Sequence, residues 1–166
     1  VFEQVRALGA IATLRHVKPH GALYNQAARD PAIARAIADG VARYSRDVAL
    51  MGLAGSVMLD VFREAGFVVM AEAFADRRYE ADGSLRSRKF ADALIRDPDE
   101  AAEQAARISE QGSVIAWSGV EVSLRAETIC IHGDTPGAVR IAEAVARRLR
   151  GSAGLRRPEP QDGQHI

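Results

Sequence analysis

The stretch Thr128-Ile129-Cys130-Ile131-His132-Gly133-Asp134-Thr135-Pro136-Gly137 is the most informative part of this chain. An apolar run ends at a polar turn, and a helical pattern of apolar residues follows. Thr135 is a favourable N-cap and Pro136 suits the first helical position, so we expect a helix to begin there, with free N–H groups that could bind an anion. The pattern predicts a strand that ends at His132 and Asp134, where α/β folds bind ligands.

Working outward, apolar strand-like runs alternate with helical patterns, several of which begin at a capping residue followed by proline, as at Asp30-Pro31 and Asp97-Pro98. This alternation predicts an α/β fold with a parallel sheet. Residues 1–150 are expected to form one domain, and residues 151–166 lack periodicity, which predicts a disordered tail. The predicted strands cover residues 14–18, 48–53, 67–71, 113–117, 120–124 and 128–131, the fourth and fifth forming a hairpin.

Composition narrows the functional classes. The 166 residues include 22 basic and 22 acidic side chains, which argues against nucleic acid or an anionic membrane as a partner. A single cysteine, Cys130, excludes an intrachain disulfide and favours a cytoplasmic location. No apolar run reaches membrane-spanning length, and no signal peptide opens the chain. Because the chain starts with Val1 inside a helical pattern, we expect it to be part of a longer protein.

Dense polar groups follow three of the predicted strands. Parallel strands end at a common rim, so we expect these groups to converge there. Glu72 follows an apolar run, where a raised pKa would suit a general acid or base, although a salt bridge with a neighbouring arginine is an equal alternative. The groups are Lys18 and His20, then Glu72, Asp76 and Arg77, and finally His132 and Asp134.

The histidines of this rim admit several chemistries. His20 and His132 could transfer protons or, together with nearby carboxylates, bind a divalent metal, or each could be a hydrogen-bonded turn residue. Lys18 could neutralise a phosphate or carboxylate, or could simply extend its ammonium group to solvent. Arg77 and Arg88 could clamp an anionic substrate bidentately.

Three motifs, taken in order, carry a resemblance to a known family. They are His16-Val17-Lys18-Pro19-His20-Gly21-Ala22-Leu23-Tyr24-Asn25, Glu72-Ala73-Phe74-Ala75-Asp76-Arg77 and Cys130-Ile131-His132-Gly133-Asp134-Thr135-Pro136-Gly137. With them the chain resembles the LamB/YcsF family, which is described as the A subunit of the prokaryotic ATP-dependent 5-oxoprolinase.

The resemblance implies a β/α barrel of the glycoside hydrolase/deacetylase type. It also implies that 5-oxoproline (pyroglutamate) is opened to L-glutamate with hydrolysis of ATP, in complex with subunits B and C. A homo-oligomer and a divalent metal are left open. The catalytic candidates on the matching motifs are Lys18, His20, Glu72, Asp76, His132 and Asp134, and the substrate-binding candidates are Tyr24, Asn25, Arg77, Arg88 and Thr135.

The chain also departs from the family. Members normally carry Asn-Cys-Asp-Leu-Gly-Glu, Gly-Phe-His-Ala-Gly-Asp and Gly-Ala-His-Pro segments, and none of these occurs here. We therefore expect an incomplete barrel that lacks its first strands and is inactive or completed by another chain. Two alternatives remain: a metal-dependent amide or N-acetyl hydrolase with His20 or His132 among its ligands, and a truncated, non-catalytic scaffold subunit.

Overall fold

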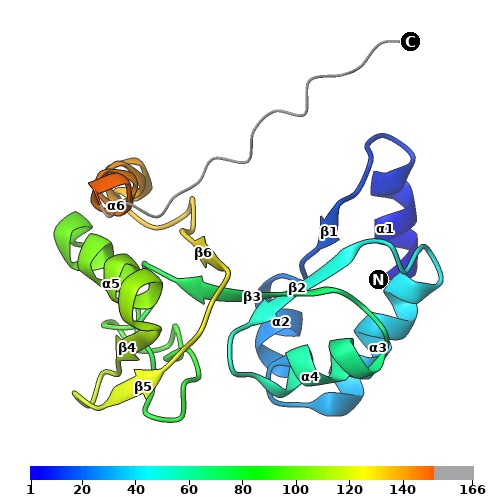
Figure 1. Ribbon diagram of the computed structural model, residues 1–166, viewed down its shortest axis with the longest axis horizontal. Coiled ribbons are helices and arrows are strands. Elements are labelled where there is room, and N and C mark those ends of the chain that lie inside the picture. Colours follow the sequence, from blue (N-terminus) through cyan, green and yellow to red (C-terminus); the bar gives the residue numbers. More distant parts are fainter. Residues whose placement is uncertain (152–166) are drawn as a thin grey trace.

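The computed structural model describes residues 1–151 of the chain. Within them, four parallel strands lie side by side in the same order as in the sequence (Figure 1). Such a sheet, in which each strand is added beside the previous one, is part of a β/α barrel, and it confirms the predicted α/β class. The strands are β1 (His16–Val17), β2 (Ala49–Leu53), β3 (Val69–Phe74) and β6 (Thr128–Cys130).

Two groups of helices flank this sheet (Figure 1). α2, α3 and α4 lie together near β1 and β2, and α4 packs against β2 and β3. α5 and α6 pack against each other at the other end of the sheet, and α5 also contacts the predicted hairpin, formed by β4 (Ser113–Ile115) and β5 (Glu121–Ser123). The helices are α1 (Phe2–Gly9), α2 (Gly21–Ala27), α3 (Pro31–Ala42), α4 (Val57–Glu64), α5 (Pro98–Gln111) and α6 (Ala138–Gly151).

Two predicted helix starts are confirmed and one is wrong. The Asp30 carboxylate accepts hydrogen bonds from the backbone at the start of α3, and Asp97 does the same for α5. The predicted start at Thr135 is wrong, because α6 begins only at Ala138. Gly137 has φ +81°, a left-handed conformation that cannot continue a helix from the preceding residues. The predicted anion site at a helix start beside Thr135 is therefore not formed.

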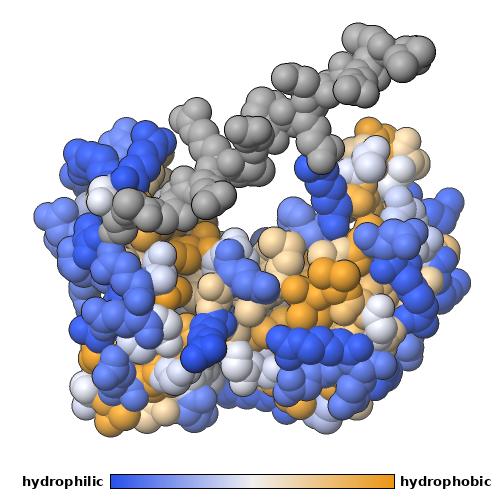
Figure 2. Space-filling model, viewed as in Figure 1, coloured by the Kyte–Doolittle hydropathy of each residue, from blue (hydrophilic) through white to orange (hydrophobic). Residues whose placement is uncertain are grey.

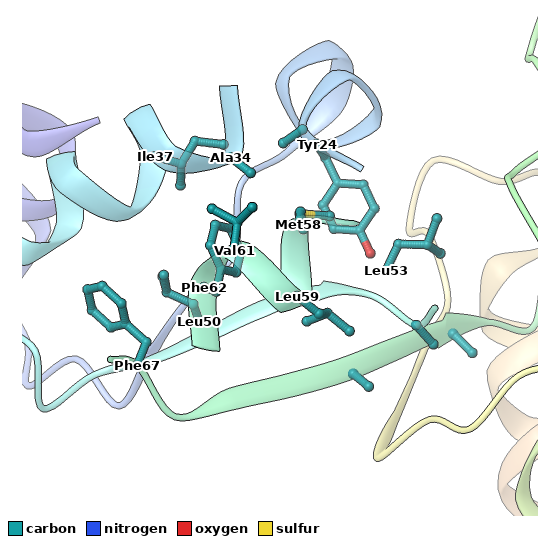
Figure 3. Close-up of a cluster of buried hydrophobic side chains, with 14 of the residues drawn as sticks. Tyr24, Ala34, Ile37, Leu50, Leu53, Met58, Leu59, Val61, Phe62 and Phe67 are labelled. Atoms are coloured by element: carbon teal, nitrogen blue, oxygen red, sulfur yellow. The ribbon is translucent and has the colours of Figure 1, made fainter. Parts of the chain in front are cut away.

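The main core lies between the sheet and helices α2 to α4 (Figure 3). Leu50 of β2 and Phe62 of α4 are fully buried in it. Gly52 permits the close packing, since a Cβ atom there would lie 2.9 Å from the Met58 Cγ atom of α4. Removing a side chain such as Phe62 from this core would cost about 3–5 kcal/mol.

A second core joins α5 to α6 and is built largely from alanines, which allow the two helices to approach closely. On the face shown in Figure 2, apolar side chains gather across the middle of the molecule, where β2 and β3 run in Figure 1. α6 extends to Gly151, the first residue of the predicted tail, while residues 152–166 lie outside the described residues. None of the helices described is both long and apolar enough to cross a membrane.

Candidate active site

A cavity of about 1030 Å³ opens where the parallel strands end. Its lining includes Lys18 from the segment after β1, Arg77 from the segment after β3, and His132 from the segment after β6. The convergence of the three predicted polar clusters at one rim is thus confirmed. His20, Tyr24, Asn25, Arg88 and Asp134 also line this cavity.

The first polar pair of the site joins Lys18 to Glu72. The ammonium Nζ of Lys18 lies 2.5 Å from Oε1 of Glu72 and 3.4 Å from Sγ of Cys130. The Tyr24 hydroxyl donates a hydrogen bond of 3.1 Å to the other oxygen, Oε2 of Glu72. Burial, together with the neighbouring Glu72 charge, raises the pKa of Tyr24, so its hydroxyl stays protonated and can donate. Glu72 therefore has the salt-bridge arrangement, with a lysine rather than the expected arginine.

Glu72 lies within β3, not after the strand as predicted, and it pairs in register with Leu53 of β2 and Thr128 of β6. Its carboxylate is buried behind Lys18 and does not line the cavity. Its predicted role as a general acid or base stays a prediction. In this structure it holds the charge of Lys18 in place.

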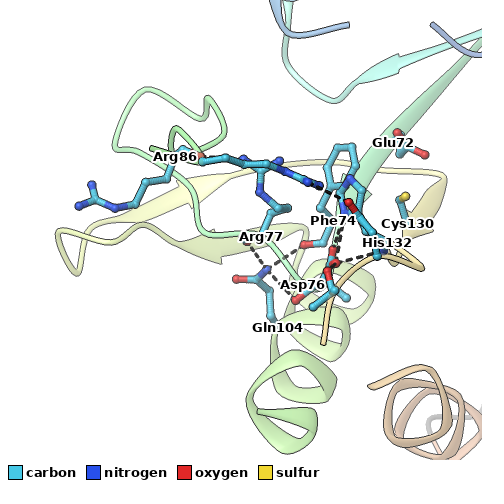
Figure 4. Close-up of polar contacts among 12 residues, drawn as sticks. Glu72, Phe74, Asp76, Arg77, Arg86, Gln104, Cys130 and His132 are labelled. Carbon is cyan, nitrogen blue, oxygen red and sulfur yellow. Dashed lines mark hydrogen bonds and ion pairs between the residues drawn. The ribbon is translucent and has the colours of Figure 1, made fainter. Parts of the chain in front are cut away.

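The second polar pair joins Asp76 to His132 (Figure 4). The fully buried Asp76 lies 3.0 Å from the ring Nδ1 of His132 and accepts a 3.0 Å bond from the His132 backbone N–H. The Thr135 hydroxyl donates a further bond of 2.7 Å to Asp76. Burial on its own would raise the pKa of Asp76, but these hydrogen bonds outweigh it and hold the pKa below its ordinary value.

An ionised Asp76 fixes the tautomer of His132. Because a carboxylate only accepts hydrogen bonds, the His132 ring must carry a proton on Nδ1, and the neutral ring then has an unprotonated Nε2. The His132 side chain is 24% exposed and lines the cavity. The arrangement can therefore take a proton from, and return it to, a molecule bound in the cavity.

One aromatic ring contacts both polar pairs. The Phe74 ring stacks on the His132 ring, with centroids 5.2 Å apart and planes 13° from parallel. The Lys18 ammonium lies 5.3 Å from the centroid of the same ring, and Tyr24 meets Phe74 edge-on at 5.9 Å. Sequence reasoning did not select Phe74, although it shares the alternation that places Glu72 and Asp76 on one side of the strand.

Two arginines occupy the loop side of the cavity. Arg77 is buried and donates a 2.7 Å hydrogen bond from Nη2 to the backbone oxygen of Arg86. Arg88 is exposed and forms an ion pair of 3.1 Å with the exposed Asp134. The Arg88 guanidinium also lowers the pKa of Asp134. Asp134 thus contacts an arginine at the rim.

Other predicted site residues have structural contacts. His20 is exposed and occupies the N-cap position of α2, and the Asn25 amide donates to the Gly21 backbone oxygen. Thr135 is buried and contacts Asp76 instead of lining the cavity. Glu72, Asp76 and Thr135 thus lie behind the residues that face the cavity, and their predicted catalytic and binding roles stay predictions.

Two further residues that support the site were missed. Gln104 of α5 places its amide nitrogen 2.8 Å from the backbone oxygens of Phe74 and Arg77, so it holds the segment that carries Asp76. A polar residue on the alanine-rich buried face of α5 was the available signal. Cys130 was expected to be inert core, but it lines the cavity beside Lys18. Burial raises the pKa of its thiol, which keeps it protonated.

A metal site is not assembled by the part of the chain that the structure describes. Within residues 1–151, no three His, Cys, Asp or Glu side chains cluster so as to hold a metal ion. Nδ1 of His132 is engaged by Asp76, which leaves this residue one free nitrogen. The described residues therefore do not fit a protein-bound divalent metal on their own.

Comparison with known proteins agrees with the motifs. The model of the LamB/YcsF family matches residues 1–161. The chain belongs to the LamB/YcsF family. It is 54% identical to the 5-oxoprolinase A subunit of Chloroflexus aggregans over 93% of this chain and 63% of that protein. It is 46% identical to the 5-oxoprolinase A subunit of Shouchella clausii over 90% of this chain and 61% of that protein.

A solved structure is similar to this LamB/YcsF chain. The lactam utilization protein from Thermus thermophilus superposes with a TM-score of 0.77 at 42% sequence identity, covering 89% of this chain and 58% of that one. The fold is therefore a curled, parallel half-barrel, consistent with part of a TIM-like barrel. The chain spans about 60–65% of the length of the curated relatives named above.

Proposed function

We propose that this chain acts as the A subunit of an ATP-dependent 5-oxoprolinase, opening the lactam of 5-oxoproline to L-glutamate. The observation that carries the proposal is the Asp76–His132 pair, which presents a basic nitrogen to a cavity that also contains Lys18 and Arg77. The relatives carry the name of the 5-oxoprolinase A subunit, which specifies the hydrolytic reaction that such a site would serve.

The chemistry explains why ATP would be needed. A five-membered lactam is a poor electrophile, and transfer of the terminal phosphoryl group of ATP to the amide oxygen would activate the carbonyl carbon. Water would then add to that carbon, the C–N bond would break, and phosphate would leave. His132 is suited to accept the proton from water and to return it to the ring nitrogen. Lys18 is suited to stabilise negative charge that develops nearby.

The remaining elements of the proposal concern partners and the complete barrel. Subunits B and C would complete the enzyme, and the half-barrel would belong to a barrel of the glycoside hydrolase/deacetylase type. We propose that any divalent cation accompanies the phosphates of ATP, which bind such ions directly. This agrees with the lack of a three-residue metal cluster among residues 1–151.

The test is glutamate release from 5-oxoproline in the complex reconstituted with subunits B and C, with and without ATP. We expect release only with ATP, and we expect His132→Ala to abolish it while the thermal unfolding curve stays cooperative. His16→Ala is the matched control, because His16 lies in β1 outside the cavity lining. Wild-type turnover by His132→Ala would contradict the site, and a complex that releases no glutamate would contradict the function.

A further inference from the structure

The side chain of Arg77 is a buried cation without a buried counter-charge. Arg77 is 4% exposed, and its Nε atom is buried with no hydrogen-bond partner. Among residues 1–151 no carboxylate forms an ion pair with it, and its hydrogen bond goes to a neutral backbone oxygen, that of Arg86. Buried charges in proteins are normally paired, because an unpaired one is costly to desolvate.

The acidic side chains nearest in chain and charge cannot supply the missing partner. Asp76 is already bonded by His132 and Thr135. Asp134 is exposed and paired with Arg88. The loop side of the cavity therefore holds two guanidinium groups and one available carboxylate, which leaves one positive charge over. Lys18 differs, because Glu72 cancels its charge.

The loop that carries Arg88 is fixed in place, so this is a built site. The Arg86 side chain is packed between the rings of Phe90 and Trp117, at 4.3 Å and 4.1 Å from their centroids. It also forms ion pairs with Glu80 and Asp92. The same residue offers its backbone oxygen to Arg77, so one clamp orders both the buried arginine and the segment leading to Arg88.

We propose that Arg77 and Arg88 form a carboxylate-binding subsite, in which Asp134 occupies Arg88 until a ligand carboxylate displaces it. A single surplus positive charge matches the single charge of a carboxylate, and Arg88 already binds one in the form of Asp134. Resting on the proposed function, the ligand is 5-oxoproline, whose carboxylate in this subsite would leave the lactam ring to face His132 and Lys18, which line the same cavity.

The test measures binding to the full chain by calorimetry with three probes: 5-oxoproline, cyclopentanecarboxylate and 2-pyrrolidinone. The second has the carboxylate without the lactam, and the third has the lactam without the carboxylate. We expect Arg77→Gln and Arg88→Gln each to weaken both carboxylates about tenfold or more and to leave 2-pyrrolidinone unchanged. Arg78→Gln is the matched control, since Arg78 pairs with Glu100 and does not line the cavity.

A second variant tests the displacement itself. Asp134→Asn removes the competing carboxylate, so we expect both carboxylate probes to bind about two- to fivefold more tightly. This pair is exposed, and the substitution should leave the fold intact. If Arg77→Gln fails to fold, Arg88→Gln and Asp134→Asn still decide the proposal.

The outcomes separate this inference from the proposed function. If 5-oxoproline binds and neither arginine variant weakens it, the subsite is wrong while the function stands. If cyclopentanecarboxylate binds in an Arg77-dependent way and 5-oxoproline does not, the subsite stands and the function is wrong. Arginine-dependent binding of inorganic phosphate without binding of either carboxylate would overturn the proposal in favour of a phosphate site, and no carboxylate binding at all would also overturn it.

Discussion

Glu72 and Asp76 are both buried carboxylates, yet they bind their partners in different ways. Glu72 lies in β3 and faces the ammonium group of Lys18, whose side chain is largely buried as well. Asp76 lies two residues beyond β3 and receives hydrogen bonds from His132 and Thr135, while the His132 ring stays partly open to the cavity. One carboxylate is paired with a full charge, and the other with neutral donors.

This difference separates two functions at one rim. The Lys18–Glu72 pair is a fixed arrangement of opposite charges, in which the carboxylate is shielded from the cavity. The Asp76–His132 pair leaves Nε2 of the imidazole available, so a proton can enter and leave without moving a heavy atom. The first pair is suited to provide a constant electrostatic environment, and the second to transfer protons.

The largest effect on stability should come from breaking the Lys18–Glu72 pair. Glu72→Gln leaves the Lys18 ammonium without its counter-charge, and we expect the free energy of unfolding to fall by about 3–5 kcal/mol. Urea denaturation of the full chain measures this. Glu100→Gln, which breaks an exposed pair with Arg78, is the control and should cost less than about 1 kcal/mol. Equal losses in the two variants would show that the buried pair is not special.

A smaller, pH-dependent effect should come from Asp76→Asn. The pKa of Asp76 is lowered in the folded protein, so its contribution to stability is present above the unfolded pKa of about 4 and is lost as pH falls through the lower folded pKa. We expect Asp76→Asn to cost about 1–3 kcal/mol at pH 7 and the difference from wild type to shrink below about pH 4. Thermal unfolding measured from pH 3 to 8 checks this.

The same variant tests the role of Asp76 as a positioning residue. Nitrogen NMR of the His132 ring should show the Nδ1-protonated tautomer in the wild type and a mixture in Asp76→Asn, because the amide no longer demands a donor. A stability difference that does not change between pH 7 and pH 3, or an unchanged tautomer, would contradict the proposed ionised state of Asp76.

Much of this site was predictable because strand ends are visible in the sequence. Apolar runs followed by polar residues placed Lys18, Arg77 and His132 at one rim, and the parallel sheet brings them together. The pairing of partners was not predictable. Lys18 and Glu72 are 54 residues apart in sequence, and Asp76 and His132 are 56 apart, so only the three-dimensional register decides which carboxylate meets which cation.

The wrong helix start has a comparable physical reason. Thr135-Pro136 has the composition of a helix start, and Asp30-Pro31 and Asp97-Pro98 do begin helices. The Thr135 hydroxyl, however, donates to Asp76, a contact made across 59 residues, and Gly137 then takes a left-handed conformation. A long-range hydrogen bond thus replaces the local cap, and no local pattern could reveal it.

The smallest of these effects should come from the ring that the two pairs share. Phe74→Leu removes the stacking on His132 and the contact with Lys18, and we expect it to cost about 1–1.5 kcal/mol. Phe67→Leu is the matched control, because Phe67 is buried in the main core and lies outside the cavity lining. Both substitutions should lower the unfolding temperature by a similar amount. Only Phe74→Leu should also change the pH dependence of glutamate release by the reconstituted complex, since the imidazole loses the ring that holds its plane. If Phe67→Leu shifts that profile equally, the shared ring acts through general stability and not through the two pairs.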